Sequence, residues 1–470
     1  MKKYFITSIL SGFLLLTSCS DQLERFPVDT LVDATAFQNV NDLQNGLRAV
    51  LSVSNMPDMV QFNAAFGDNA RRGKDSGGQA DNVLRQVLNP DGGDGGMWVD
   101  RYNAINQINR VLTAAESITP ADSGEATLYN DIRGQLLALR GYWHSQLLIY
   151  YGIDMTNSGS PGIVYQNSVE TDAVGDRLTT GEVLTLIEQD FNDALGLLTN
   201  TDINYPTADF ITFQRARIAL WTGNYSTAAS LATSLIDSYP LANTVQYAAM
   251  FAGDVDATEV VWKYDNVQGS NNSLAGRFRF TGSVQDNNFI AISLGFFDVL
   301  NDPSDIRRTV FVAPDGNGSS FADEDYGINK YPPNADTQYI NDYKIMRISE
   351  MYLLRAEANA KQSNFAAAQA DIVALRTVRG SSRATPVYAD LVTALTDIVL
   401  ESRIELCFEG HRYLTLKRTR GDLNVGIERD TRDCGGATPC SLPVGSEKWT
   451  FPIPTTELNG NPDISQAPGY

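Results

Sequence analysis

A helix–turn–helix unit that occurs twice constrains the fold of this chain more than any other feature. The first copy spans 211–240, with a tight turn at Asn224-Tyr225. In the second copy, 140 positions further on, Asn364-Phe365 matches Asn224-Tyr225 and Arg355-Ala356 matches Arg215-Ala216. The unit is about 34 residues long, which is the tetratricopeptide period. Such helix pairs cannot bury both faces alone, so we expect them to stack on neighbouring helices.

Helical periodicity extends well beyond the repeats. Apolar residues recur at spacings of three and four along 180–198, and Thr179 with Glu182 forms a capping box in front of them. A further candidate helix spans 136–150 and contains Arg140-Gly141, an Arg-small dipeptide like those of the repeats. The predicted fold class is mainly α: tetratricopeptide-like helix pairs stacked into one body, with long irregular loop-rich insertions and a few short strands.

One long central stretch lacks this periodicity. Residues 241–345 are rich in Gly, Asn, Asp and aromatic residues, and short strand patterns occur at 259–263 and 277–280. Long irregular segments in compact proteins are often functional. We therefore expect 241–345 to be a loop-rich insertion that faces a ligand. The helical regions on either side of it, 36–240 and 346–470, are expected to pack together as one body.

The beginning of the chain predicts export. Two lysines precede an apolar stretch from Phe5 to Leu16, and Leu16-Thr-Ser-Cys19 follows. The stretch is too short to span a bilayer comfortably, and small residues precede the cysteine. This pattern resembles a bacterial lipoprotein signal, so we expect removal of residues 1–18, acylation of Cys19 and a tether over 19–35. An ordinary secretory signal with an incidental cysteine is the alternative. No later stretch is apolar enough to predict a transmembrane helix.

The charge balance narrows the choice of partners. The chain has 56 acidic and 36 basic residues, a formal net charge of −20. A body this acidic repels nucleic acid phosphates, so we expect no nucleic-acid partner. The same repulsion argues against anionic glycans over most of the surface. A local basic site, such as the one that Arg71, Arg72 and Lys74 would form, remains open.

Patterns typical of catalysis are absent from the sequence. The two histidines, His144 and His411, each lie in a helical pattern, and neither a zinc-protease motif nor a serine nucleophile elbow occurs. Gly73-Lys74 precedes an aspartate and therefore does not match a phosphate-binding loop. Asp323 and Asp325 suggest calcium, but the spacing of an EF-hand is not met. We expect no catalytic residue, no metal and no cofactor, with calcium as the open alternative.

The cysteines fall into two groups beyond Cys19. Cys407 lies in an apolar helical stretch, which predicts a buried thiol. Cys434 and Cys440 enclose the loop sequence Gly-Gly-Ala-Thr-Pro, and outside the cytoplasm such a pair could close a small disulfide. A metal site is the competing interpretation, although no histidine lies nearby to complete it.

Aromatic residues in irregular segments are the candidates for ligand contact. Sugars pack their C–H faces on aromatic rings, and their hydroxyl groups bond to a few polar side chains. Four of the five tryptophans lie in patterns typical of core positions; Trp98 is at a loop-to-helix junction, where packing is the alternative role. The predicted ligand-binding residues are Trp98, Asp68, Asn69, Arg71, Tyr326, Tyr331 and Tyr339.

Several motifs in fixed order carry a family resemblance over nearly the whole chain. They are Trp98-Val-Asp-Arg-Tyr102, Leu137-Ala-Leu-Arg-Gly-Tyr-Trp143, Arg347-Ile-Ser-Glu350, Tyr352-Leu-Leu-Arg-Ala-Glu357, Glu405-Leu-Cys-Phe-Glu-Gly-His-Arg-Tyr413, Phe451-Pro-Ile-Pro454 and Gln466-Ala-Pro-Gly-Tyr470. In these motifs the chain resembles the SusD/RagB family, the surface nutrient-binding lipoproteins of Bacteroidetes. It departs from the family pattern at Ser402, Thr415 and Ala467, which look like structural positions.

The resemblance implies a function and a partner. It implies an outer-membrane lipoprotein, anchored at the cell surface by acylated Cys19, that binds a nutrient, an oligo- or polysaccharide, and delivers it to a SusC-like TonB-dependent transporter. A glycoside hydrolase or other surface enzyme, and a peptide-binding helical scaffold, are the alternatives. The charged residues of the motifs are expected to form partly buried ion pairs rather than a site. They are Arg347, Glu350, Arg355, Glu357, Glu405, Glu409, Arg412, Lys417 and Arg418.

Overall fold

The computed structural model describes residues 36–470 except 53–55, 93–95, 170–174, 267–272, 280–287, 318, 333–339 and 436–438. The expected signal, the tether, Cys19 and Tyr339 lie outside these residues. Helices dominate the described part of the chain, and one apolar core runs from the N-terminal helices to the C-terminal segment. This confirms the predicted mainly α class. Within the described residues, no helix combines the length and apolar character needed to cross a membrane.

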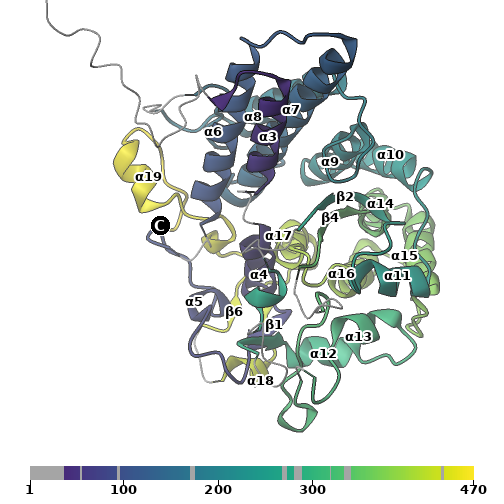
Figure 1. Cartoon of the computed structure of the whole chain (residues 1–470). Coiled ribbons are helices and arrows are strands. Elements are labelled where there is room, and N and C mark those ends of the chain that lie inside the picture. Colours follow the sequence, from purple (N-terminus) through teal and green to yellow (C-terminus); the bar gives the residue numbers. More distant parts are fainter. Residues whose placement is uncertain are drawn as a thin grey trace, which may run out of the picture.

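Four helices of the N-terminal half pack together at the top of Figure 1. They are α3 (Val40–Ser52), α6 (Met97–Ala115), α7 (Ser123–Tyr151) and α8 (Thr180–Leu195). The predicted capping box of Thr179 and Glu182 begins α8. Gly141 lets α7 and α8 approach closely, because a Cβ atom there would lie 2.7 Å from the ring of Phe191.

The two predicted repeats are helix pairs that stack on each other, which confirms the repeat. The first pair is α9 (Ala208–Trp221) with α10 (Tyr225–Ile236), and the second is α14 (Ile348–Lys361) with α15 (Phe365–Arg379). Helix α10 packs along α14 (Figure 1). Arg355 bridges the pairs, since its guanidinium donates to the Asp371 carboxylate at 2.7 Å and to the Thr233 hydroxyl at 3.0 Å.

Two further C-terminal helices complete the body. Helix α16 (Leu391–Glu405) packs on α14 and α15, and α17 (Arg412–Leu423) packs between α16 and α4 (Met56–Phe66). The remaining short helices are α5 (Asp81–Leu84), α11 (Thr244–Phe251), α12 (Leu294–Leu300), α13 (Ile306–Phe311), α18 (Thr431–Cys434), α19 (Thr455–Gly460) and the 3-10 turns η1 (Ala275–Arg277), η2 (Phe321–Asp323) and η3 (Glu447–Trp449).

The described strands form three two-stranded antiparallel sheets. They pair β1 (Ala70–Arg72) with β3 (Ile290–Ile292), β2 (Val260–Tyr264) with β4 (Tyr343–Arg347), and β5 (Ile427–Glu428) with β6 (Ser441–Leu442). Strand β2 confirms the strand predicted at 259–263. The strand predicted at 277–280 is wrong over its described residues: η1 ends at Arg277, and Arg279 forms one isolated bridge rather than a ladder.

The central segment 241–345 is more helical than its composition predicts. It contains α11, α12 and α13, which are eight, seven and six residues long. Helices of about two turns show too few repeats of a 3.6-residue period to be recognised from sequence. Helix α13 contacts α16 through Arg307 and Glu401, and the loop residues Lys330 and Tyr331 donate to the carbonyls of Cys407 and Phe408, which follow α16.

The charged motif residues form ion pairs, as predicted, and many are more deeply buried than expected. Glu405 is fully buried and accepts hydrogen bonds from Arg307, Arg347 and Arg379. Lys417 differs, because its ammonium donates to the backbone carbonyl of Ile149 at 2.7 Å. The set Arg307, Arg347, Arg379, Glu259, Glu401, Glu405 and Glu409 is called the buried charge network below.

Candidate functional site

Three segments far apart in the sequence meet where β1 pairs with β3. Arg71 lies opposite Ala291 in this pairing, and the amide of Ile292 donates to the Tyr326 carbonyl at 2.9 Å. Only glycine fits at position 73, since a Cβ atom there would lie 2.0 Å from the carbonyl oxygen of Asn288. The backbone thus brings 70–74, 288–297 and 320–326 together. We call this surface the β1–β3 face.

A small aromatic cluster lies on the β1–β3 face. The rings of Phe297 and Tyr326 stack at a centroid separation of 3.6 Å and an interplanar angle of 7°. Phe321 meets Tyr326 edge-on at 5.3 Å, and the Arg308 guanidinium lies 5.3 Å from the Phe297 centroid. Phe297 is nearly buried, whereas Phe321 and Tyr326 are partly exposed. The buried ring supports the two that reach the surface.

Charged side chains surround this cluster. Arg71 donates to the Glu324 carbonyl and lies 4.0 Å from the Asp325 carboxylate. The Lys74 ammonium pairs with Asp323 at 3.0 Å, and both side chains are about half exposed. Asp325 is 2% exposed, and its carboxylate accepts from the side-chain amide of Asn288 at 3.0 Å. Burial raises the pKa of Asp325, against the lowering effects of the Asn288 hydrogen bond and the Arg71 charge.

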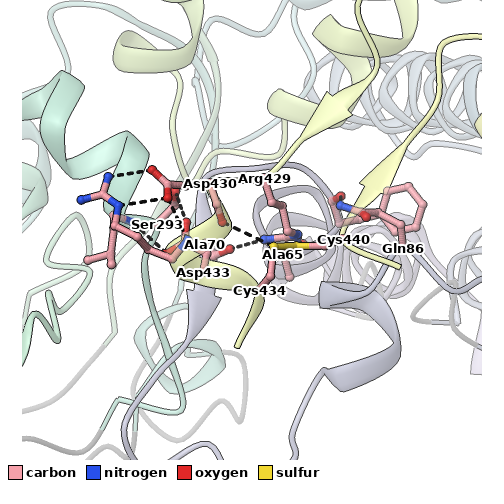
Figure 2. The surroundings of a disulfide bond; sticks show 12 residues. Ala65, Ala70, Gln86, Ser293, Arg429, Asp430, Asp433, Cys434 and Cys440 are labelled. Atoms are coloured by element: carbon pink, nitrogen blue, oxygen red, sulfur yellow. Dashed lines mark hydrogen bonds and ion pairs between the residues drawn. A yellow bond between two sulfur atoms is a disulfide. The ribbon is translucent and has the colours of Figure 1, made fainter. Parts of the chain in front are cut away.

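Helix α18, which ends at the disulfide-bonded Cys434, packs against β1. Asp433 accepts from the Ser293 hydroxyl at 2.7 Å and from the Leu294 amide at 3.0 Å, so it fixes the start of α12 (Figure 2). Cys434 and Cys440 form a disulfide with a Cα–Cα separation of 5.8 Å, as expected from their spacing. Cys407 is a buried free thiol that follows α16, and burial raises its pKa to about 12.

Asp68 and Asn69 do not reach this surface, which corrects the expectation that they contact a ligand. Asp68 accepts from Arg412 at 2.8 Å and lies 3.3 Å from Arg403. Asn69 is fully buried and accepts from Arg403 at 2.9 Å. Burial alone would raise the pKa of Asp68, but the charges of Arg403 and Arg412 outweigh it and hold this pKa well below its usual range. The pair anchors the start of β1 to the C-terminal helices.

Trp98 and Tyr331 are core residues, and their expected role as ligand platforms is also corrected. Trp98 is 2% exposed, lies between Tyr102 and Tyr151, and donates its indole N–H to Glu457 at 3.2 Å. Tyr331 is 3% exposed and donates its hydroxyl to the Phe408 carbonyl at 2.7 Å. Neither ring has a face open to a ligand. Of the predicted contact residues that the structure describes, only Arg71 and Tyr326 come together at the surface.

The β1–β3 face also contains residues that the sequence analysis did not single out. Phe297, Phe321 and Arg308 complete the aromatic cluster, and all three lie in the irregular segment 241–345. Tyr326 was selected because it is an aromatic residue in the irregular segment 241–345. Phe297 and Phe321 meet the same criterion, so the sequence could have indicated them as well.

The β1–β3 face presents aromatic rings beside charged and amide groups. Flat rings with adjacent charged and amide groups suit a ligand that has both C–H faces and hydroxyl groups. Asp323 and Asp325, the calcium candidates, are engaged by Lys74 and Asn288 respectively. Across the described ranges, no group of three or more histidine, cysteine, aspartate and glutamate side chains has a geometry that could hold a metal ion.

Two family models match the chain. The model described as the SusD family matches residues 313–470. The model described as starch-binding and associating with the outer membrane matches residues 19–218. No curated protein matches the chain.

Solved structures show the same fold over nearly the whole chain. A SusD superfamily protein from Bacteroides thetaiotaomicron is 21% identical with a TM-score of 0.77, covering 92% of this chain and 100% of its own. A putative sugar binding protein from Bacteroides vulgatus is 23% identical with a TM-score of 0.77, covering 93% and 100%. A laminarin binding SusD-like protein is 20% identical with a TM-score of 0.69, covering 92% and 100%. The SusD family model and the SusD-like model between them match 19–218 and 313–470, and on these matches the chain belongs to the SusD/RagB family.

Proposed function

We propose that this protein is a surface lipoprotein of the outer membrane that binds a glycan on the β1–β3 face and delivers it to a SusC-like TonB-dependent transporter. The observation that carries the proposal is the aromatic cluster. Tyr326 and Phe321 expose part of their rings beside Arg71, Lys74 and Asp323. The family's description as starch-binding and outer-membrane-associated supports the same conclusion, as do the solved neighbours described as binding sugar and laminarin.

The binding test uses calorimetry with the mature protein and a panel of oligosaccharides, laminarin and starch fragments included. Tyr326→Ala removes the stacked surface ring, and we expect affinity to fall about tenfold, the equivalent of about 1.4 kcal/mol. Tyr225→Ala, which removes a partly exposed tyrosine on α10, is the matched control and should leave affinity unchanged. Equal loss in both variants, or no binding by any glycan, would contradict the proposal.

Release of reducing ends during the same incubations separates binding from hydrolysis. In the proposed function the glycan is recovered intact after prolonged contact with the protein. Steady product formation would instead indicate the alternative surface enzyme.

Two cellular tests address anchoring and hand-over. Cys19→Ser should abolish labelling with a fatty-acid probe and release the protein from the membrane fraction. An affinity tag on the wild-type chain should recover a TonB-dependent β-barrel from detergent-solubilised membranes. Retention of the Cys19→Ser protein in the membrane, or recovery without any barrel, would count against the corresponding part of the proposal.

A further inference from the structure

The aromatic cluster leaves one ring face of Tyr326 uncovered. Phe297 stacks on the opposite face at a centroid separation of 3.6 Å. Phe321 lies 5.3 Å from Tyr326 and 6.2 Å from Phe297. These separations place Phe321 beside the edge of Tyr326, because a ring over its outer face would lie much farther from Phe297. Tyr326 is partly exposed, so a sugar ring can stack on this one face, with Phe321 at its border.

Glu324, two positions before Tyr326, has an exposed side chain with unused hydrogen-bonding capacity. Within the described part of the chain, its carboxylate forms neither an ion pair nor a hydrogen bond. The acidic residues on either side of it are engaged: Asp323 pairs with Lys74 at 3.0 Å, and Asp325 accepts from a side-chain amide at 3.0 Å. Glu324 can therefore offer both of its carboxylate oxygens to a ligand.

The Glu324 carboxylate lies close enough to the ring of Tyr326 to act on its hydroxyl group. Burial raises the pKa of Tyr326 most, the carboxylates of Glu324 and Asp298 raise it further, and the guanidinium groups of Arg71 and Arg308 oppose them. Asp298 already has an arginine partner at 2.7 Å. The two negative and two positive groups that act on this hydroxyl balance in sign, which suits an uncharged ligand.

The backbone of Glu324 adopts a conformation that glycine favours. Its φ of 55° and ψ of 24° lie in the left-handed region, where a Cβ atom is crowded. Two contacts hold it there: its amide donates to the Phe321 carbonyl at 3.2 Å, and its own carbonyl accepts from Arg71. Strained residues of this kind cluster at functional sites. Glycine would suit this turn better, so the turn alone does not explain a glutamate at position 324.

We propose that Glu324 is a specificity-determining residue, whose carboxylate binds two adjacent hydroxyl groups of the sugar stacked on Tyr326. Each carboxylate oxygen accepts one hydrogen bond, which matches a pair of neighbouring hydroxyl donors. The inference rests on the proposed glycan-binding function and specifies its substrate class. A 1,4-linked hexose ring keeps its 2- and 3-hydroxyl groups free and adjacent, whereas an inner 1,3-linked ring has no adjacent free pair. We therefore expect a 1,4-linked glycan.

The test compares maltohexaose, cellohexaose and mannohexaose, which are 1,4-linked, with 1,3-linked laminarihexaose, by calorimetry on the mature protein. The best 1,4-linked ligand should bind about tenfold more tightly than laminarihexaose. Glu324→Gln keeps the size of the side chain but replaces one acceptor by a donor. This variant should weaken binding of the 1,4-linked ligand about tenfold and remove the preference.

Glu324→Gly separates the role of the side chain from that of the turn. It removes the carboxylate and relieves the crowded conformation, so the 1,4-linked ligand should bind about tenfold more weakly while Tm does not fall. Ser363→Gly is the matched control, because Ser363 is also left-handed, with a φ of 62°, and lies in the turn between α14 and α15. Gly223 takes the same position in the first repeat, with a φ of 75°. The control should keep wild-type affinity and preference.

The outcomes distinguish this inference from the proposed function. If laminarihexaose binds as well as the 1,4-linked hexaoses, the inference is overturned while glycan binding stands. The same holds if the Glu324 variants keep wild-type affinity and preference although Tyr326→Ala loses affinity. If no glycan binds, or if Tyr326→Ala and both Glu324 variants bind like the wild type, the inference and the proposed function fail together.

Discussion

Glutamine in place of Glu405 tests how much the buried charge network contributes to holding the central segment 241–345 against the C-terminal helices. Glu405 is fully buried at the end of α16. Its carboxylate accepts from Arg347 at 3.0 Å, from Arg379 at 3.0 and 3.1 Å, and from Arg307 at 3.2 Å. Glutamine has the same shape, but one of its terminal atoms is an NH₂ donor that would face guanidinium donors.

The cost follows from these contacts. Breaking a buried ion pair by removing one partner destabilises a protein by about 3–5 kcal/mol, because the remaining charge stays buried. Each arginine here keeps another carboxylate: Glu401 for Arg307, Glu259 for Arg347 and for Arg379. The lower end, about 3 kcal/mol, is therefore expected. An unfolding entropy of about 2.1 cal/mol/K per residue over roughly 400 residues converts this free energy into a Tm decrease of about 4 °C.

Thermal and urea unfolding of Glu405→Gln and Glu188→Gln measure the effect. Glu188 is the matched control, since it also receives two bonds from one arginine, Arg215, but its side chain is 51% exposed. An exposed pair contributes about 0–1 kcal/mol, so the control should lose at most about 1 °C. If both variants unfold together, burial adds nothing to these pairs and the reasoning is refuted.

Three further predictions concern other parts of the fold. His144 is fully buried, and burial lowers its pKa to about 3 from about 6.5, so the unfolded chain binds more protons than the folded chain between these pH values. The free energy of unfolding should therefore fall as the pH drops below 6.5, by about 1.4 kcal/mol per pH unit. Urea unfolding of His144→Gln, measured over the same pH range, should lack this contribution. Gly73→Ala forces the β1–β3 pairing apart at Asn288, so calorimetry should show weakened glycan binding, whereas unchanged affinity would separate the face from binding. Replacing Cys434 and Cys440 by serine opens a short loop, and chemical denaturation should show a loss of about 2 kcal/mol.

Local patterns carried most of the fold prediction. The helices of the two repeats were predictable because alanines and turn residues within each unit determine the pairing, as Arg215-Ala216 and Arg355-Ala356 indicate. The capping box at Thr179 and the disulfide between neighbouring cysteines are equally local. In each case the residues that interact lie in the same helix, turn or loop, or in adjacent ones.

The candidate site was less predictable because its contacts are distant in sequence. Trp98 lies in the first turn of α6, directly after a loop, and its burial depends on Glu457, which lies 359 positions away. Asp68 resembles a loop residue until Arg412, 344 positions later, is placed beside it. Tyr326 is partly exposed, and the ring on which it stacks, that of Phe297, comes from α12, 29 positions earlier.

These long separations have a consequence for how the chain acquires its structure. The segment that begins at Phe451 contacts the end of α7, where the Phe451 amide donates to the Tyr150 carbonyl at 3.0 Å. Ile453 and Ile464, near the end of the chain, belong to the same core as the N-terminal helices. The apolar core around the N-terminal helices is therefore complete only when residues 451–464 are in place, and truncation before Phe451 is expected to uncover part of that core.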